Sequence, residues 1–255
     1  MSRVTKALRE WWAAPPRPRG WGQVVTVRHA FYGPIRLFRW DEGISQHLFD
    51  GHTVWEPEVV EIFAREWVAG RNAIDAGANL GLHSIALAKL AARGAKVYAI
   101  EPHPEVFPLT RANCRRFAAV TCIKAAASDR LRTVSMPRLR RGGNAAIAAV
   151  SDAAAAGRHA VRAVTIDSLG LTNVGFIKID TEGHELACLR GAAETIRRDR
   201  PTLLVEICGG HDLQTASPKV AATIRASIAE IEALGYAVEQ VSSHDYLCRP
   251  RAASA

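Results

Sequence analysis

The sequence has few of the features that mark several common classes of protein. Its five cysteines are odd in number, lie scattered along the chain and include no Cys-x-x-Cys pair, which argues against a disulfide framework and against a zinc site. No apolar run is long enough for a signal peptide or a membrane span. We therefore expect a soluble protein of the reducing cytoplasm.

Two catalytic signatures are absent as well. The chain contains no Gly-Lys-Ser/Thr sequence, which excludes an enzyme that transfers phosphate with a P-loop. None of its four tyrosines has a lysine four residues further on, as a short-chain oxidoreductase would need. His47, Asp50 and His52 are scattered in an expected loop, and we predict no metal site there.

Arginine gives the chain an excess of positive charge. There are 33 lysines and arginines against 25 acids, for a formal charge of +8 at pH 7. The arginines cluster at residues 17–28, 111–116, 138–141 and 197–200. Few aromatic residues accompany them and no nucleic-acid reading motif is present, so we interpret the clusters as solvated faces and do not expect a nucleic-acid partner.

The length of 255 residues and a hydrophobic content of 48% suit one α/β domain. From residue 72 onward, expected strands and helices alternate, which favours a parallel sheet covered on both faces. We assign residues 56–250 to this main domain and residues 1–55 to an N-terminal extension. The extension comprises a short helix, a hairpin and a loop that we interpret as a possible lid, at residues 3–12, 24–38 and 41–55.

A glycine turn after a buried strand organises the chain. Gly77 and Gly81 follow the strand expected at 73–75, a helix follows at 82–92, and the next strand ends at Glu101. Glycine removes the Cβ where the chain turns sharply or where a ligand approaches the backbone. These elements form one βαβ unit with a cofactor crevice at its carboxyl end.

The details of this turn indicate which cofactor it holds. Gly77 and Gly81 stand four apart with Asn79 between them, which is the wrong spacing for a dinucleotide fingerprint. A carboxylate at Asp75, about 4 Å from a pyrophosphate, would repel it by roughly 1 to 4 kcal/mol. S-adenosylmethionine satisfies both acids, because its ribose diol can meet Glu101 and its ammonium group can lie near Asp75.

Two later segments contribute further candidates. Asp129 follows the third core strand at the same edge of the sheet, where it meets the adenine amino group or acts as a simple turn residue. Residues 139–158 form an irregular segment rich in alanine, glycine and arginine. Such long insertions are usually functional, and we interpret this one as part of the acceptor pocket.

Four sequences together resemble the FkbM-type S-adenosylmethionine-dependent methyltransferases. They are residues 74–81 (Ile-Asp-Ala-Gly-Ala-Asn-Leu-Gly), 99–102 (Ala-Ile-Glu-Pro), 164–167 (Val-Thr-Ile-Asp) and 176–185 (Phe-Ile-Lys-Ile-Asp-Thr-Glu-Gly-His-Glu). The likeness covers about residues 53–207. It implies the class I methyltransferase fold: a Rossmann-like, doubly wound α/β sheet of seven strands in the order 3-2-1-4-5-7-6, with the last strand antiparallel.

The resemblance also implies an activity and a set of cofactor residues. Members of the family methylate hydroxyl groups, so we expect O-methylation of a sugar, a glycan or a natural-product small molecule. By position, the resemblance makes Asp75, Gly77, Asn79 and Gly81 the cofactor turn and Glu101 the ribose ligand. Two alternatives stay open: a non-catalytic nucleoside-binding or partner-binding module, and a methyltransferase acting on nucleic acid.

A hydroxyl acceptor needs a general base close to the methyl group. Asp180 lies where the resemblance places the opening of the fourth strand under that group, and Glu182, His184, Glu185 and Glu206 are nearby candidates. We favour His184, because its ordinary pKa of about 6.5 suits a base at neutral pH. The alternatives are that His184 caps a helix and that the two glutamates near it stabilise the helix N-terminus.

Overall fold

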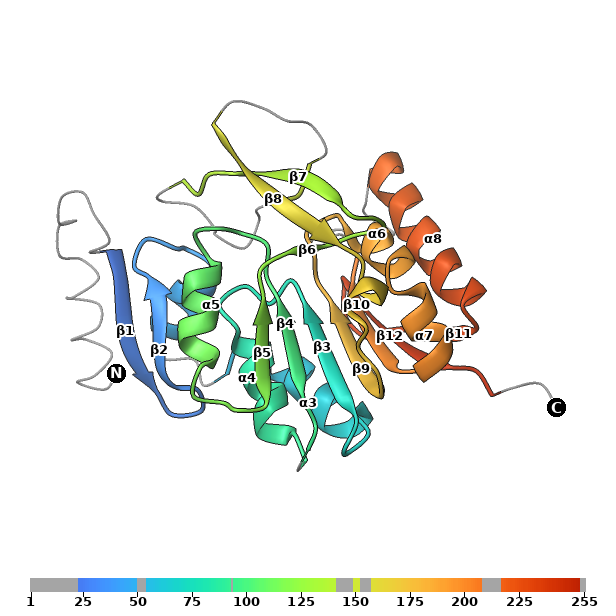
Figure 1. The fold of residues 1–255 in the computed structure, drawn as a ribbon, viewed down its shortest axis with the longest axis horizontal. Coiled ribbons are helices and arrows are strands. Elements are labelled where there is room, and N and C mark those ends of the chain that lie inside the picture. The colour runs from blue at the N-terminus through green and yellow to red at the C-terminus, as the bar shows by residue number, and fades with distance from the viewer. Residues whose placement is uncertain are drawn as a thin grey trace.

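The computed structural model describes residues 23–49, 54–92, 94–140, 149–151, 157–207 and 217–252. Its centre is a seven-stranded sheet in the order β5 (Val120–Ile123), β4 (Val97–Ile100), β3 (Asn72–Ala76), β9 (Val174–Ile179), β10 (Thr202–Glu206), β12 (Asp245–Pro250) and β11 (Tyr236–Gln240) (Figure 1). Five strands are parallel, while β12 is antiparallel to both β10 and β11. Counted along the chain, this is the predicted order 3-2-1-4-5-7-6 with an antiparallel last strand, so the fold prediction is confirmed.

Helices cover both faces of the sheet, as its buried strands require. All six residues of β9 are buried, which is typical of a central parallel strand. Helices α3 (Pro57–Glu66) and α4 (Leu82–Leu90) pack on one face, and α6 (Glu185–Arg190), α7 (Ala193–Asp199) and α8 (Pro218–Ala233) pack on the other. The strand order reverses between β3 and β9, which is where open α/β sheets bind their ligands.

A second, three-stranded sheet replaces a crossover helix between β5 and β9. It contains β6 (Ala126–Ala127), β7 (Arg132–Pro137) and β8 (Arg158–Val164), and a short 3-10 helix, η3 (Asp167–Leu169), follows it. Figure 1 shows β7 and β8 lying beyond the carboxyl ends of the parallel strands. The sequence predicts short strands at residues 132–136 and 161–165, which β7 and β8 confirm, and these strands form a roof over the crevice. Residues 141–148 and 152–156 of the predicted irregular segment lie outside the described residues.

The N-terminal hairpin is part of the same hydrophobic packing. Strands β1 (Val24–His29) and β2 (Gly33–Phe38) pair antiparallel, as predicted, and β2 lies against α5 (Phe107–Cys114). Asn113 bonds both backbone groups of Arg36, because its Oδ1 accepts the N-H at 2.7 Å and its Nδ2 donates to the carbonyl at 3.1 Å. The division at residue 55 stays a prediction, and the predicted helix at 3–12 lies outside the described residues.

The segment predicted as a loop before α3 is partly helical, so that prediction was wrong in part. Helix α2 (Ile44–Phe49) forms because Ile44, Leu48 and Phe49 share one face that is buried in the hairpin cluster. Asp41 supports its start, since Oδ2 accepts the Ser45 N-H at 2.9 Å.

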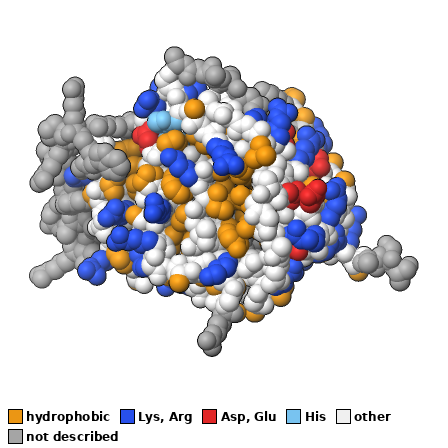
Figure 2. Space-filling model, viewed as in Figure 1, with side chains coloured by type: hydrophobic (Ala, Val, Ile, Leu, Met, Phe, Trp, Pro, Cys, Tyr) orange, Lys and Arg blue, Asp and Glu red, His pale blue; other side chains and the backbone are white. Residues whose placement is uncertain are grey.

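Arginine and lysine dominate the charged surface on the face shown in Figure 2, where they surround a hydrophobic area. The described members of the basic clusters that are exposed include Arg111, Arg115, Arg116, Arg138, Arg140, Arg197 and Arg198. Their exposure fits the interpretation of these clusters as solvated faces. Among the described helices, none has the length and apolar character needed to cross a membrane.

Candidate active site

A cavity of about 310 Å³ opens at the carboxyl ends of β3, β4, β9 and β10. This volume falls within the range of small-molecule sites. The roof strands contribute Ala126, Ala127 and Met136, and α2 contributes Ile44. The lining carries five carboxylates and four histidines: Glu56, Glu101, Asp180, Glu182, Glu206, His83, His103, His184 and His244. The cavity is therefore strongly acidic, although the chain as a whole is basic.

The first glycine of the turn allows two strand ends to touch. Gly77 has a φ of 89°, and a Cβ at this position would lie 1.6 Å from the carbonyl oxygen of Asp180. The Asp180 N-H in turn donates to the Ala76 carbonyl at 2.9 Å. Only glycine fits here, so Gly77 fixes the distance between the cofactor turn and the loop after β9.

We expect Gly77→Ala to destabilise the protein much more than Gly94→Ala does. Gly94 has a similar φ of 93° with no atom within 4 Å of its Cβ position, so its substitution costs only the left-handed backbone, about 1 to 2 kcal/mol. Gly77→Ala adds about 1 to 3 kcal/mol for overpacking. Urea denaturation of both variants measures the difference, and equal losses would contradict the contact described above.

Asn79 and Glu101, two of the predicted cofactor residues, lie together in the cavity wall. The N-H of Asn79 donates to Glu101 Oε2 at 2.8 Å, and the N-H of His103 donates to Oε1 at 2.7 Å. A carboxylate has about four acceptor positions, so two are left for a diol. Asn79 Oδ1 is buried and has no hydrogen-bond partner among the described residues. Burial raises the pKa of Glu101 to about 7 despite the two backbone hydrogen bonds.

Three predicted cofactor residues do not line this cavity. Asp75 is fully buried, and its Oδ2 accepts a hydrogen bond from Ser84 in α4 at 2.5 Å. Gly81 precedes α4 and has a φ of 83°. A Cβ at this position would lie 2.6 Å from the sulfur of Cys114. Asp129 forms an ion pair with an arginine three residues on. The structure places all three behind or beside the wall, and their cofactor roles stay predictions.

The three predicted catalytic residues lie together on the loop after β9 and line the cavity. The sequence predicts that the helix after β9 starts near residue 181, but α6 begins at Glu185, because Glu182 and Gly183 have left-handed φ angles of 53° and 90°. Glu182 is therefore not in a helix. Burial, then the charges of Asp180 and Glu185, raise the pKa of Glu182 to about 7.

Glu185, the first residue of α6, contacts the backbone of the loop before it. Its side chain is buried, and Oε1 accepts the N-H of Thr181 at 3.2 Å and that of Gly183 at 2.8 Å. It therefore holds the loop that presents Glu182. Glu206 ends β10 and lines the cavity, where burial and the charge of Asp180 raise its pKa to about 9.

Lys178 is a buried cation beneath these acids. It is 2% exposed, and its Nζ lies 2.8 Å from Asp180 Oδ2, on the same side of β9. Burial lowers the pKa of Lys178, but the charges of Asp180, Asp75 and Glu56 outweigh that effect and hold it above its ordinary value. Its charge therefore persists, and one oxygen of Asp180 is engaged in the ion pair.

His184 makes a hydrogen bond that limits its use as a base. Its Nε2 lies 2.9 Å from Ser128 Oγ, and that hydroxyl also lies 3.1 Å from Asp129 Oδ1. A hydroxyl has one proton. When Ser128 donates to Asp129, His184 Nε2 carries a proton and donates to Ser128, so Nε2 cannot act as the base and Nδ1 is the ring nitrogen that would have to.

Several lining residues were not identified from the sequence. Glu56 precedes α3 and has a left-handed φ of 44°, and its Oε2 lies 3.3 Å from His83 Nε2. Burial raises the pKa of Glu56 to about 7. Of the five described non-glycine residues with positive φ, Glu56, Asn79 and Glu182 line the cavity, which is where strained backbone is often found.

Solved structures with a similar fold include two methyltransferases and a fibrillarin, all at low sequence identity. Methyltransferase FkbM from Methylobacillus flagellatus KT has a TM-score of 0.49 at 14% identity, over 80% of this chain and 52% of that one, so this chain spans about half of its length. An O-methyltransferase from Bacillus cereus has a TM-score of 0.47 at 14% sequence identity, and the match covers 97% of this chain and 90% of that one. Fibrillarin from Aeropyrum pernix has a TM-score of 0.44 at 12% sequence identity, and the match covers 92% of this chain and 85% of that one. Among curated proteins there is no significant match.

A family model described as the methyltransferase FkbM domain matches residues 75–238, which is more than half of the chain. This range runs from the strand before the glycine turn to the terminal hairpin and includes the strand ends that form the cavity. S-adenosylmethionine, the cofactor predicted from the sequence, is the methyl donor of such an enzyme. The chain belongs to the FkbM methyltransferase family.

Proposed function

We propose that this protein transfers a methyl group to a hydroxyl of a neutral small molecule, such as a sugar, a glycan or a natural product. The observation that carries the proposal is the cavity wall itself, which joins a ribose-type site at Glu101 to a set of carboxylates around Glu182. Bound S-adenosylmethionine supplies a methyl group already activated as a sulfonium. The residues of the chain bind and orient the reactants and remove the proton of the acceptor.

The charges of the cavity favour a cationic cofactor and a neutral acceptor. Five acidic side chains line it, and those of Glu56, Glu101 and Glu182 become ionised as the pH rises through their pKa values of about 7. The nearby lysine, Lys178, is buried in an ion pair. Like charges at short distance repel by roughly 1 to 4 kcal/mol at surface-like dielectric, so a phosphate or carboxylate on the acceptor is disfavoured. The same argument disfavours nucleic acid, and hydroxyl groups are suited to the carboxylate acceptors.

Glu182 is our candidate for the general base that removes the proton of the acceptor hydroxyl. Its pKa of about 7 lies near the pH at which a general base is most effective. Asp180 is engaged by Lys178, and the pKa of Glu206, about 9, leaves that carboxyl protonated at neutral pH. Glu206 is therefore suited to donate a hydrogen bond to the acceptor.

We expect the affinity for S-adenosylmethionine to rise between pH 6 and pH 8. The pKa values of Glu56, Glu101 and Glu182 are about 7, and a cation binds better once these groups are ionised. The demethylated product lacks the sulfonium charge, so its affinity should rise less. Titration calorimetry at both pH values measures this. An affinity that is constant or falls with pH would contradict the electrostatic argument, and binding of NAD in place of either nucleoside would reject the cofactor site.

A methyl-transfer screen tests the acceptor class. Neutral glycans and hydroxylated natural products are compared with the same molecules carrying a phosphate, and transfer is followed as formation of the demethylated cofactor. The proposal predicts turnover with the neutral members alone. Tight cofactor binding without turnover on any acceptor would favour the non-catalytic binding module, and transfer to RNA or DNA would favour the nucleic-acid enzyme.

A further inference from the structure

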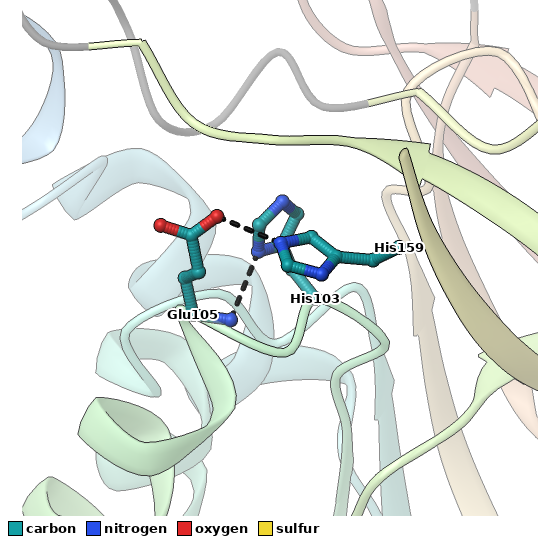
Figure 3. Close-up of side chains that lie close together, drawn as sticks. All are labelled: His103, Glu105 and His159. Carbon is teal, nitrogen blue, oxygen red and sulfur yellow. Dashed lines mark hydrogen bonds and ion pairs between the residues drawn. The ribbon is translucent and has the colours of Figure 1, made fainter. Parts of the chain in front are cut away.

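Two histidines and a glutamate lie close together where β8 of the roof sheet meets the segment between β4 and α5 (Figure 3). His103 follows β4, Glu105 lies in the turn before α5, and His159 belongs to β8. One ligand atom of each lies within 4.8 Å of the other two. His159 Nε2 is 2.8 Å from Glu105 Oε1, and the two imidazole rings are nearly perpendicular at 5.5 Å between centroids. Three donors from three separate segments thus converge on one point.

Hydrogen bonds to the backbone hold two of these side chains in place. His103 is 1% exposed, and its Nε2 lies 2.9 Å from the Pro137 carbonyl, which can only accept. Nε2 therefore carries the proton, as in many metal-bound histidines. The lone pair of Nδ1 accepts the Glu105 N-H at 3.2 Å (Figure 3), a long hydrogen bond that a metal ion has to displace. Glu105 Oε1 accepts the N-H of Leu139 at 3.2 Å. Pro137 and Leu139 both lie at the end of β7, so the roof itself orients the donors.

We propose that His103, Glu105 and His159 form a binding site for a divalent transition-metal ion, with Zn²⁺ the best match. Two imidazoles and one carboxylate are a common donor set for zinc with three protein ligands and an open position. At metal distances of about 2.0 to 2.1 Å, tetrahedral ligand atoms lie about 3.3 Å apart. The pair at 2.8 Å has only to open slightly, with the ion taking the place of the proton between His159 and Glu105. The Glu105 side chain is 40% exposed and is free of dense packing.

The position of the site suggests that a bound ion stabilises the attachment of the roof sheet. His103 lines the cavity, and its backbone N-H donates to the carboxylate of Glu101, which also lines the cavity. An ion bound here ties strand β8 to the turn that carries Glu101. This role is independent of the proposed methyl transfer, because it concerns how the roof is held on the body of the protein.

The test is titration of the full-length protein, first treated with a chelator, with Zn²⁺. We expect one ion per chain to be lost or its Kd to be weakened by more than about 100-fold in His159→Ala and in Glu105→Gln. His244→Ala is the matched control, because it removes a histidine from the other three-donor group of the described residues, Glu206, His244 and Asp245. Unchanged binding in His159→Ala, or loss in His244→Ala alone, would overturn the proposal.

Two further measurements keep the test decisive if a variant folds poorly. Co²⁺ added to the chelator-treated wild type should give visible bands of a four- or five-coordinate site with nitrogen and oxygen ligands, and only the weak spectrum of the hydrated ion would count against the site. Saturating Zn²⁺ should also raise the Tm of the wild type, since a ligand that binds only the folded state stabilises it. No shift at any Zn²⁺ concentration would overturn the site without reference to cofactor binding or turnover.

Discussion

Replacing Glu182 with glutamine should lower methyl-transfer turnover by about 100- to 10,000-fold, the usual contribution of a general base. Glutamine keeps the size and the hydrogen-bonding ability of the side chain but cannot take a proton. Burial and the neighbouring acids raise the pKa of Glu182 to about 7, so the wild-type rate should fall as the pH drops through that value. The variant should lose this acid limb, as measured from kcat at saturating cofactor.

Two comparisons separate this role from general electrostatic effects. Glu58→Gln removes an exposed acid from the first turn of α3 and should leave the rate and its pH profile unchanged. His184→Gln removes the imidazole that contacts Ser128 and should lower the rate less than Glu182→Gln does, with the acid limb still present. If His184→Gln instead abolishes the limb while Glu182→Gln keeps it, the histidine favoured from the sequence is the base.

The sheet was predictable because each of its strands is specified locally. The glycine turn after β3, the acid at the end of β4 and the apolar run of β9 are each visible in a few consecutive residues. The start of one helix was less certain: the apolar pattern predicts a helix over residues 221–234, but α8 begins at Pro218, because Ser217 accepts the Val220 N-H as its cap.

The composition of the cavity was not predictable in the same way. Glu56, His83 and His244 come from segments that meet only after the sheet has formed, and no local pattern distinguishes them. The shift of α6 to Glu185 depends on left-handed backbone at Glu182, which sequence disfavours and tertiary contacts impose. The ring of His159 reaches His103 across the roof sheet, so their proximity likewise depends on tertiary structure.

The electrostatics of the cavity depend on one buried cation, and its removal should have a large effect. Lys178→Met should lower the free energy of unfolding by about 3 to 5 kcal/mol, because breaking a buried ion pair leaves an uncompensated charge. Lys178 also lowers the pKa of Asp75, Glu56, Glu182 and Glu206. Lys124→Met is the control, since Lys124 is exposed and its loss should change stability by no more than about 0.5 kcal/mol.

The pH dependence of this loss identifies its cause. Without Lys178, the carboxyl pKa values in the folded state rise further above their unfolded values. Stability from such groups is present below the unfolded pKa and is lost as the pH rises through the folded pKa, so the deficit of Lys178→Met should be larger at pH 8 than at pH 5. Urea denaturation at both values measures it, and Lys178→Met/Asp180→Asn should recover part of the loss at pH 8. A deficit that is equal at the two pH values would mean that Lys178 stabilises the sheet by packing and that the acids of the cavity do not depend on its charge.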